Sequence, residues 1–306
     1  MLDRRSFLTL AATGLPFAAL ANEPPIPIID THIHLFDPTR PQGVPWPPKD
    51  NPILYKPALP ARYERIARPL GVVGAIEIEA SPWLEDNQWV LDLAASNPII
   101  VGTVGDLEPG KPDFRKDLDR FQKNPLFRGI RYGNLWGRDL GARLAEPAFL
   151  ADLKSLAGAG LALDTANPDP ALIADVVRLT DRVPNLRVIV DHLPNLQLPT
   201  DSGSRSAYEA NLRELAARPQ IYIKISQVQQ VPDRKTVLDH LWEIFGPDRL
   251  LYGSDWPNSD PFGSYAQVLS IVRSYFQAKG RAAAEKYFWR NSVAAYRWVK
   301  RDATQP

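Results

Sequence analysis

The chain of 306 residues contains no cysteine, so no disulfide can contribute to its stability. It also lacks an excess of charge of either sign, because 36 basic residues face 35 acidic ones and the net charge is +1. A balanced chain exerts no broad electrostatic attraction on nucleic acid or on anionic lipid. We therefore expect a small-molecule partner and no nucleic acid.

Two nucleotide-binding motifs are missing as well. Neither a G-x-G-x-x-G nor a Walker sequence follows any apolar run, so a nucleotide-binding fold would lack its phosphate cradle. The apolar content of 44% and the charged content of 23% are typical of a globular chain with a large core. The length would suit two average domains, but α/β barrels often take 200 to 250 residues or more as one domain.

The first residues have the order of an export signal. Paired Arg4 and Arg5 precede Ser6-Phe7-Leu8, a mildly apolar segment and a small-residue site that ends at Ala21. This order predicts a twin-arginine signal over residues 1–21, a mature domain over 22–306 and a periplasmic location. A frayed helix is the alternative. The apolar part falls short of the roughly 20 residues that span a bilayer, so we expect no stable membrane anchor after cleavage.

The rest of the chain alternates between short aliphatic runs and helical patterns. Eight such units in strict alternation predict a (β/α)8 barrel of the TIM type, built as a single domain, rather than an open doubly wound sheet. The expected strands are residues 26–30, 72–80, 99–104, 127–132, 161–165, 186–192, 221–226 and 249–255. A long Pro-rich loop, residues 35–60, follows the first strand and would lie over the mouth of the barrel. Such a loop is either a functional lid or a rigid surface connection.

Ionisable side chains stand at the end of nearly every expected strand. Active sites of these barrels form at the carboxyl ends of the strands, so these side chains should share one rim. Residues two apart on a strand point to the same face, so His32 and His34 should enter the same cavity. His192 and Asp255 follow the sixth and eighth strands. Each imidazole could bind a metal ion or donate a hydrogen bond.

Simpler roles exist for these residues taken one at a time. A lone histidine is usually a satisfied core residue, and Asp255 in "YGSDWPN" could cap a helix. Neither role explains why three histidines and an aspartate collect at one rim. The fourth histidine, His240, falls in a helical pattern and is expected to be structural or exposed.

Two cations and several tryptophans are candidates for substrate binding. Arg131 and Lys224 could bind a substrate carboxylate, or could form ion pairs inside the barrel with the acidic residues of neighbouring strands. Trp83 and Trp256, in expected β–α loops like Trp46 and Trp136, could stack on a sugar-like ring or pack the loops.

Four motifs carry a resemblance to a known family. The stretches "DTHIHLFDP", "VIVDHLPN", "IYIKIS" and "LLYGSDWP" resemble the amidohydrolase superfamily, in particular the amidohydrolase-2 branch that contains sugar-acid lactonases and the 2-pyrone-4,6-dicarboxylate lactonase. The resemblance covers essentially all of residues 22–306. It implies a distorted (β/α)8 barrel, hydrolysis by an activated water, and Asp255 as the general base beside His32, His34 and His192.

The resemblance also bears on the metal. The fifth strand ends in "LDTAN", which has neither the His nor the Lys of two-metal amidohydrolases. The expected cofactor is therefore one divalent ion, zinc or manganese, held by His32, His34, His192 and Asp255, or none at all. The expected activity is that of a hydrolase that opens a lactone of a sugar acid or related polar ring.

Other functions remain open from the residues alone. A metal-dependent amidohydrolase or a nonoxidative decarboxylase of the same branch would need a tightly held ion. A metal-dependent nuclease also begins with His-x-His, but the chain lacks a basic stripe. A non-catalytic periplasmic binder of sugar acids would keep Arg131 without needing Asp255. The sequence does not indicate the oligomeric state.

Overall fold

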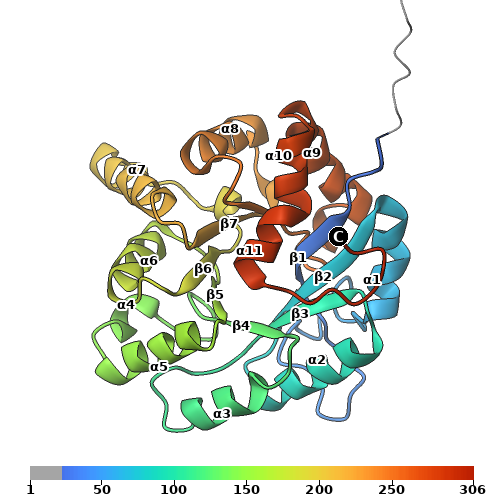
Figure 1. Cartoon of the computed structure of the whole chain (residues 1–306), viewed down its shortest axis with the longest axis horizontal. Coiled ribbons are helices and arrows are strands. Elements are labelled where there is room, and N and C mark those ends of the chain that lie inside the picture. Colours follow the sequence, from blue (N-terminus) through green and yellow to red (C-terminus); the bar gives the residue numbers. More distant parts are fainter. Residues whose placement is uncertain (1–22) are drawn as a thin grey trace, which may run out of the picture.

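The computed structural model describes residues 23–306, and eight parallel strands of this part form one sheet in the order β1 to β8 (Figure 1). The predicted export signal lies outside the described residues. The strands are β1 (Ile28–Ile33), β2 (Val72–Ile78), β3 (Ile100–Gly105), β4 (Phe127–Arg131), β5 (Ala162–Thr165), β6 (Arg187–Val190), β7 (Ile221–Ile225) and β8 (Leu250–Tyr252).

The sheet nearly closes on itself. The Thr31 hydroxyl of β1 donates to the carbonyl oxygen of Tyr252 in β8 at 2.7 Å, and the amide of His34 donates to the carbonyl oxygen of Trp256 at 2.8 Å. The expected (β/α)8 barrel is therefore confirmed. β6 and β8 end earlier than expected, because the chain leaves the extended conformation before His192 and Asp255.

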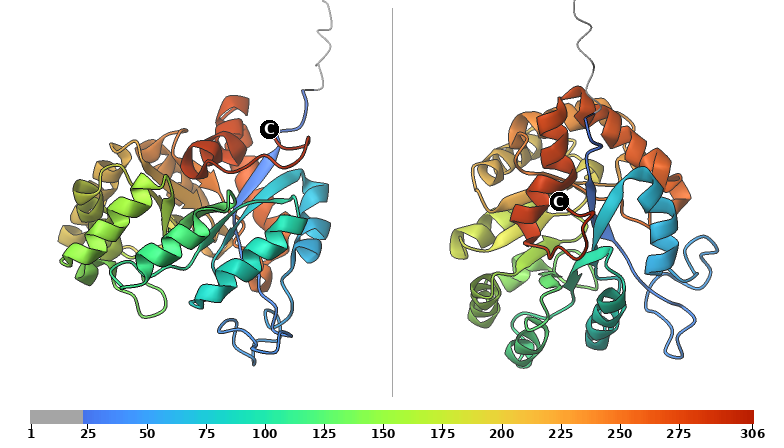
Figure 2. Two further views of the ribbon diagram at one scale, coloured as in Figure 1. Left: turned by 60° about the horizontal axis from the view of Figure 1, so that its bottom comes forward. Right: turned by 45° about the vertical axis from the view of Figure 1, so that its right-hand side comes forward.

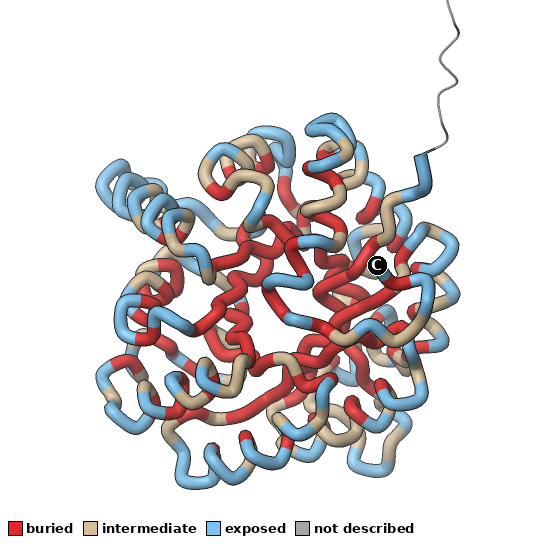
Figure 3. Tube along the Cα trace, viewed as in Figure 1, coloured by how far each residue is buried: buried red, intermediate tan, exposed pale blue. Residues whose placement is uncertain are grey.

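Helices cover the outside of the barrel (Figures 1 and 3). They are α1 (Pro60–Ala67), α2 (Leu84–Ser96), α3 (Phe114–Phe121), α4 (Leu140–Arg143), α5 (Pro147–Gly158), α6 (Pro170–Arg182), α7 (Ser202–Ala216), α8 (Arg234–Phe245), α9 (Tyr265–Ala278), α10 (Arg281–Glu285) and α11 (Asn291–Tyr296). Local signals start several of them: Pro170 occupies the first turn of α6, and the Asp169 side chain caps its N-terminus by accepting from the amide of Leu172. None of the described helices is both long and apolar enough to cross a membrane.

The C-terminal segment closes one mouth of the barrel. A short π-helical stretch, Lys286–Arg290, joins α10 to α11. Beyond it, Tyr296 and Trp298 pack against the interior residues Ile29 and Ile76. In Figure 2 this segment lies at one end of the molecule and the blue Pro-rich loop at the other. The mouth at the carboxyl ends of the strands is therefore the one left for a site.

The Pro-rich loop is fastened at its base and along its length. Phe36 and Ala58 pair through two backbone hydrogen bonds of 3.2 and 2.9 Å. The Arg40 guanidinium donates to Asp86 of α2 at 2.8 Å and lies 4.3 Å from the ring centroid of Trp89. The loop therefore forms a fixed wall at the carboxyl ends of the strands.

Candidate active site

Three imidazoles face one carboxylate oxygen at this mouth. Oδ1 of Asp255 lies 3.6 Å from Nε2 of His32, 3.3 Å from Nε2 of His34 and 4.0 Å from Nε2 of His192. All four side chains are buried. The residues that the sequence singled out at the ends of three strands thus meet around a single point, as the barrel geometry requires.

The backbone at this rim is unusual. Six of the described non-glycine residues adopt the left-handed conformation, with φ between 49° and 58°, and five of them line the same cavity. These five are Trp136, Asn167, His192, Gln227 and Asp255. This conformation is costly for residues with a side chain and is concentrated at functional sites. Four of these residues follow the end of a strand by two or three positions, and Trp136 follows β4 by five.

His34 has a defined tautomer. Its Nδ1 lies 2.8 Å from the carbonyl oxygen of Ile78, which can only accept, so Nδ1 carries the proton. In the neutral imidazole, Nε2 then presents a lone pair to Oδ1 of Asp255 at 3.3 Å. Two acceptors at this distance need a proton or a metal ion between them.

His32 directs a second ring nitrogen toward the same point. Its Nε2 is buried and has no hydrogen-bond partner, while its Nδ1 lies 3.5 Å from Oδ1 of Asp191 and 3.2 Å from Nζ of Lys224. A carboxylate beside the other ring nitrogen is typical of a metal-binding histidine. Ligand atoms of His32, His34 and Asp255 lie within 4.8 Å of one another, and so do those of His32, Asp191 and His192. Two imidazole nitrogens and a carboxylate oxygen fit one zinc or manganese ion.

Burial and local charge set the ionisation of these groups. Burial alone would raise the pKa of Asp255, but the imidazoles around it, His192 foremost, favour its charged form and lower the pKa. Burial lowers the pKa of His192 to about 4 and that of His32 well below its usual value. At neutral pH an ionised Asp255 therefore lies beside neutral imidazoles of His32 and His192.

Two amides hold the other oxygen of the carboxylate. The side-chain amides of Gln227 and Asn258 donate to Oδ2 of Asp255 at 2.8 and 2.9 Å. Their bonds leave Oδ1 facing the imidazoles. The sequence analysis missed both residues because it followed charged groups, although Gln227 directly follows a strand end and Asn258 belongs to the quoted "YGSDWPN" turn.

A cavity of about 230 Å³ opens above this cluster. It is lined by His34, Trp46, Glu79, Ala80, Arg131, Leu135, Trp136, Asn167, His192, Gln227, Asp255 and Asn258. Of the four predicted substrate contacts, Arg131 lies in this wall, with its Nε donating to Oδ2 of Asp191 at 3.0 Å. Its NH2 lies 3.5 Å from Nε2 of His192.

The other three candidate substrate contacts, Lys224, Trp256 and Trp83, lie outside the wall of this cavity. Lys224 is wholly buried beneath His32 and pairs with Asp164 at 2.6 Å and Asp191 at 3.0 Å, so the interior ion pair is its role. Trp256 is also fully buried. The centroid of its ring lies 5.3 Å from that of Tyr63 in α1.

Trp83 is 39% exposed at the start of α2 and does not reach the cavity. The tryptophans of the wall are instead Trp46, from the Pro-rich loop, and Trp136, which follows β4. All four tryptophans lie in loops, and a loop position alone does not tell which way a ring points.

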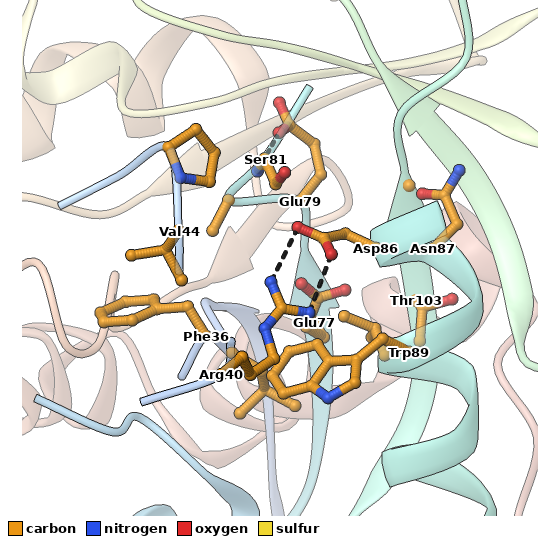
Figure 4. Close-up of a pocket in the computed structure, with 15 residues that line it drawn as sticks. Phe36, Arg40, Val44, Glu77, Glu79, Ser81, Asp86, Asn87, Trp89 and Thr103 are labelled. Carbon is orange, nitrogen blue, oxygen red and sulfur yellow. Dashed lines mark hydrogen bonds and ion pairs between the residues drawn. The ribbon is translucent and has the colours of Figure 1, made fainter. Parts of the chain in front are cut away.

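A second, smaller cavity lies between the Pro-rich loop, β2 and α2 (Figure 4). Its wall includes Glu77, Arg40 and Asp86, and the ion pair of the last two crosses it in Figure 4. Glu79 and Ala80 belong to the walls of both cavities. Glu79 thus stands at the boundary between the two.

Comparisons with known proteins agree with this geometry. A family model described as "Amidohydrolase" matches residues 29–298. An L-fucono-1,5-lactonase of Burkholderia ambifaria is 29% identical over 257 residues, covering 79% of this chain and 85% of that protein. An L-fucono-1,5-lactonase of Burkholderia multivorans is 25% identical over 281 residues, covering 87% of this chain and 94% of that protein. A solved amidohydrolase structure from Burkholderia multivorans, with bound zinc, has a TM-score of 0.78 at 22% identity and covers 89% of this chain and 100% of that one.

Proposed function

Since the chain belongs to the amidohydrolase family, as its motifs led us to expect, we propose that it hydrolyses a lactone of a sugar acid or a related polar ring. The observation that carries this proposal is the convergence of three imidazoles on Oδ1 of Asp255 at the floor of a cavity. The two lactonases among its relatives support the same reaction.

The residues divide the chemistry between them. Asp255 is ionised, and its Oδ1 accepts a proton from the water that attacks the lactone carbonyl. The amides of Gln227 and Asn258 keep Oδ2 occupied, so that Oδ1 is the oxygen that reacts. Breaking the ring C–O bond leaves an alkoxide, which takes up the proton held on Asp255. The product is the open hydroxy acid.

The remaining groups stabilise charge at the carbonyl. His192, whose Nδ1 lies 2.7 Å from the Ser226 hydroxyl, is fixed in orientation, and Arg131 lies beside it. Both face the space where the carbonyl oxygen becomes negative. A divalent ion would be held by His32, His34 and Asp255, where it would act as a Lewis acid on the carbonyl and lower the pKa of water.

A substrate screen tests the proposal. Purified protein, with and without added zinc or manganese, is offered aldono-lactones, uronic-acid lactones and 2-pyrone-4,6-dicarboxylate, and acid release is followed with a pH indicator. Turnover of at least one lactone, lost in Asp255→Asn, is the expected result. Release of carbon dioxide from carboxylated aromatic compounds, with no lactone opened, would instead identify a decarboxylase.

We also propose that residues 1–21 direct export to the periplasm by the twin-arginine route, with no membrane anchor left after cleavage. The support is the order of Arg4, Arg5, an apolar segment and Ala21 in the sequence. Fusion of residues 1–30 to a reporter, with Arg4 and Arg5 replaced by Lys in the control, tests the route. Export that persists in the control would reject it.

A further inference from the structure

The charges around the cavity limit what substrate it can hold. Among the described residues of its wall, Arg131 is the single lysine or arginine, and its Nε is already bonded to Asp191. The carboxyl groups of Glu79 and Asp255 belong to the same wall. A substrate with several free carboxylates would find only one guanidinium in this wall to balance them. The wall therefore favours a neutral ring.

The carboxyl group of Glu79 is held by neutral donors. The Trp136 indole N–H donates to its two oxygens at 3.2 and 3.1 Å, and the Ser81 amide donates to Oε2 at 3.1 Å. Glu79 is 5% exposed, and no lysine or arginine of residues 23–306 lies within ion-pair distance of it. A carboxylate offers about four acceptor positions. Part of this capacity remains for groups inside the cavity.

Such a carboxyl is costly to bury unless a ligand uses it. Burial raises the pKa of Glu79 to about 8 against the opposing charge of Arg131, so at neutral pH this carboxyl group is mostly protonated and can both donate and accept a hydrogen bond. Sugar hydroxyls are the ligands that neutral or ionised carboxyl groups bind well, since each hydroxyl both donates and accepts. Three uncharged amides, those of Asn167, Gln227 and Asn258, extend the same chemistry around the wall.

Building on the proposed lactone hydrolysis, we propose that Glu79, oriented by Trp136, binds the ring hydroxyls of the substrate. The preferred substrate is then a neutral, polyhydroxylated lactone rather than one that carries further carboxylates. Glu79 determines specificity in this scheme, and Asp255 performs the chemistry. Trp136 is a positioning residue, because its indole N–H fixes the carboxyl group.

The test compares a polyhydroxylated and an unsubstituted lactone that share the same six-membered ring. The kcat/KM of a hexono-1,5-lactone and of unsubstituted δ-valerolactone is measured for the wild type and for Glu79→Gln. Replacing the carboxyl group with an amide removes part of its hydrogen bonding to the ring hydroxyls, which should lower kcat/KM for the hydroxylated lactone roughly 3- to 10-fold, and that for δ-valerolactone by less than about twofold. Glu77→Gln is the matched control, because Glu77 lies two residues earlier, in β2, and lines only the smaller cavity. It should leave the ratio of the two values unchanged.

A second variant covers the case in which Glu79→Gln fails to fold. Trp136→Phe removes the indole N–H and keeps an aromatic ring. It should lower the ratio of kcat/KM for the hydroxylated lactone to kcat/KM for δ-valerolactone. Equal losses on both lactones in the variants, or a wild type that prefers 2-pyrone-4,6-dicarboxylate, would overturn this inference and leave lactone hydrolysis standing. A wild type that opens no lactone would reject the proposed function itself.

Discussion

Nζ of Lys224 lies 3.2 Å from Nδ1 of His32, on the far side of the imidazole from Asp255. The same ammonium group contacts Asp164, which also accepts a hydrogen bond of 2.7 Å from the Tyr296 hydroxyl. Polar contacts therefore run from the C-terminal segment that closes one mouth of the barrel to the imidazole at the floor of the other. The orientation of His32 depends on this network.

Removal of the buried cation should destabilise the fold. In Lys224→Met, Asp164 loses its cation, and Asp191 keeps only Arg131. Breaking a buried ion pair from one side costs about 3–5 kcal/mol, which urea unfolding would measure. Adding Asp164→Asn to this variant should recover part of the loss, since the unpaired charge disappears. A loss below about 1 kcal/mol in the single variant would contradict the role of Lys224.

Replacement of the proposed base should abolish turnover without unfolding the protein. Asp255→Asn keeps the size of the side chain, and asparagine tolerates the left-handed backbone that Asp255 adopts, with φ of 58°. Because an amide cannot take up the proton, kcat should fall by roughly 10²- to 10⁴-fold. Asp260→Asn, which disturbs only the surface pair with Arg62, is the control. Undiminished turnover in Asp255→Asn would reject the assigned base.

A divalent ion should stabilise the folded protein through the imidazole cluster. A ligand at 100 times its dissociation constant adds about 2.7 kcal/mol, which appears as a rise in Tm. Thermal unfolding with zinc or manganese should show this rise in the wild type and lose it in His34→Gln. His240→Gln is the control, because His240 lies in α8 and pairs with Glu209 instead. An equal rise in all three proteins would place the ion elsewhere.

The convergence of the cluster could be predicted from the sequence, but its detailed geometry could not. Parallel strands bring their carboxyl ends together, so polar residues after β1, β6 and β8 had to share a rim, and strand periodicity placed His32 and His34 on one face. The direction of each loop side chain depends on the left-handed backbone at the rim, and no local sequence pattern predicts where that conformation occurs. The burial of the Trp256 ring and the position of Lys224 under His32 could not be predicted either, because both depend on packing between segments distant in the chain.

Glu79 should make the folded protein less stable as pH rises, and Glu79→Gln should remove this contribution. Its pKa is raised from 4.5 to about 8 in the folded protein. Between these values the unfolded chain releases a proton that the folded protein keeps, so this group makes the fold less stable as pH rises from 4.5 to 8. Glu79→Gln should therefore gain stability relative to the wild type by a few kcal/mol across this window. Urea unfolding at several pH values measures the difference, and a constant difference would contradict the raised pKa.

Close packing of β1 and the β8 end should make Gly253 intolerant of a side chain. A Cβ placed on Gly253 would lie 2.8 Å from Cβ of His32, a distance that requires the backbone to move. Overpacking of this kind costs about 1–3 kcal/mol, and here the displaced residue is an imidazole of the cluster, so Gly253→Ala should also lower turnover and the Tm rise with zinc. Gly158→Ala is the matched control, because a Cβ there meets no atom within 4 Å and its φ is not left-handed. Equal stability and turnover in the two alanine variants would show that β8 can shift without disturbing His32.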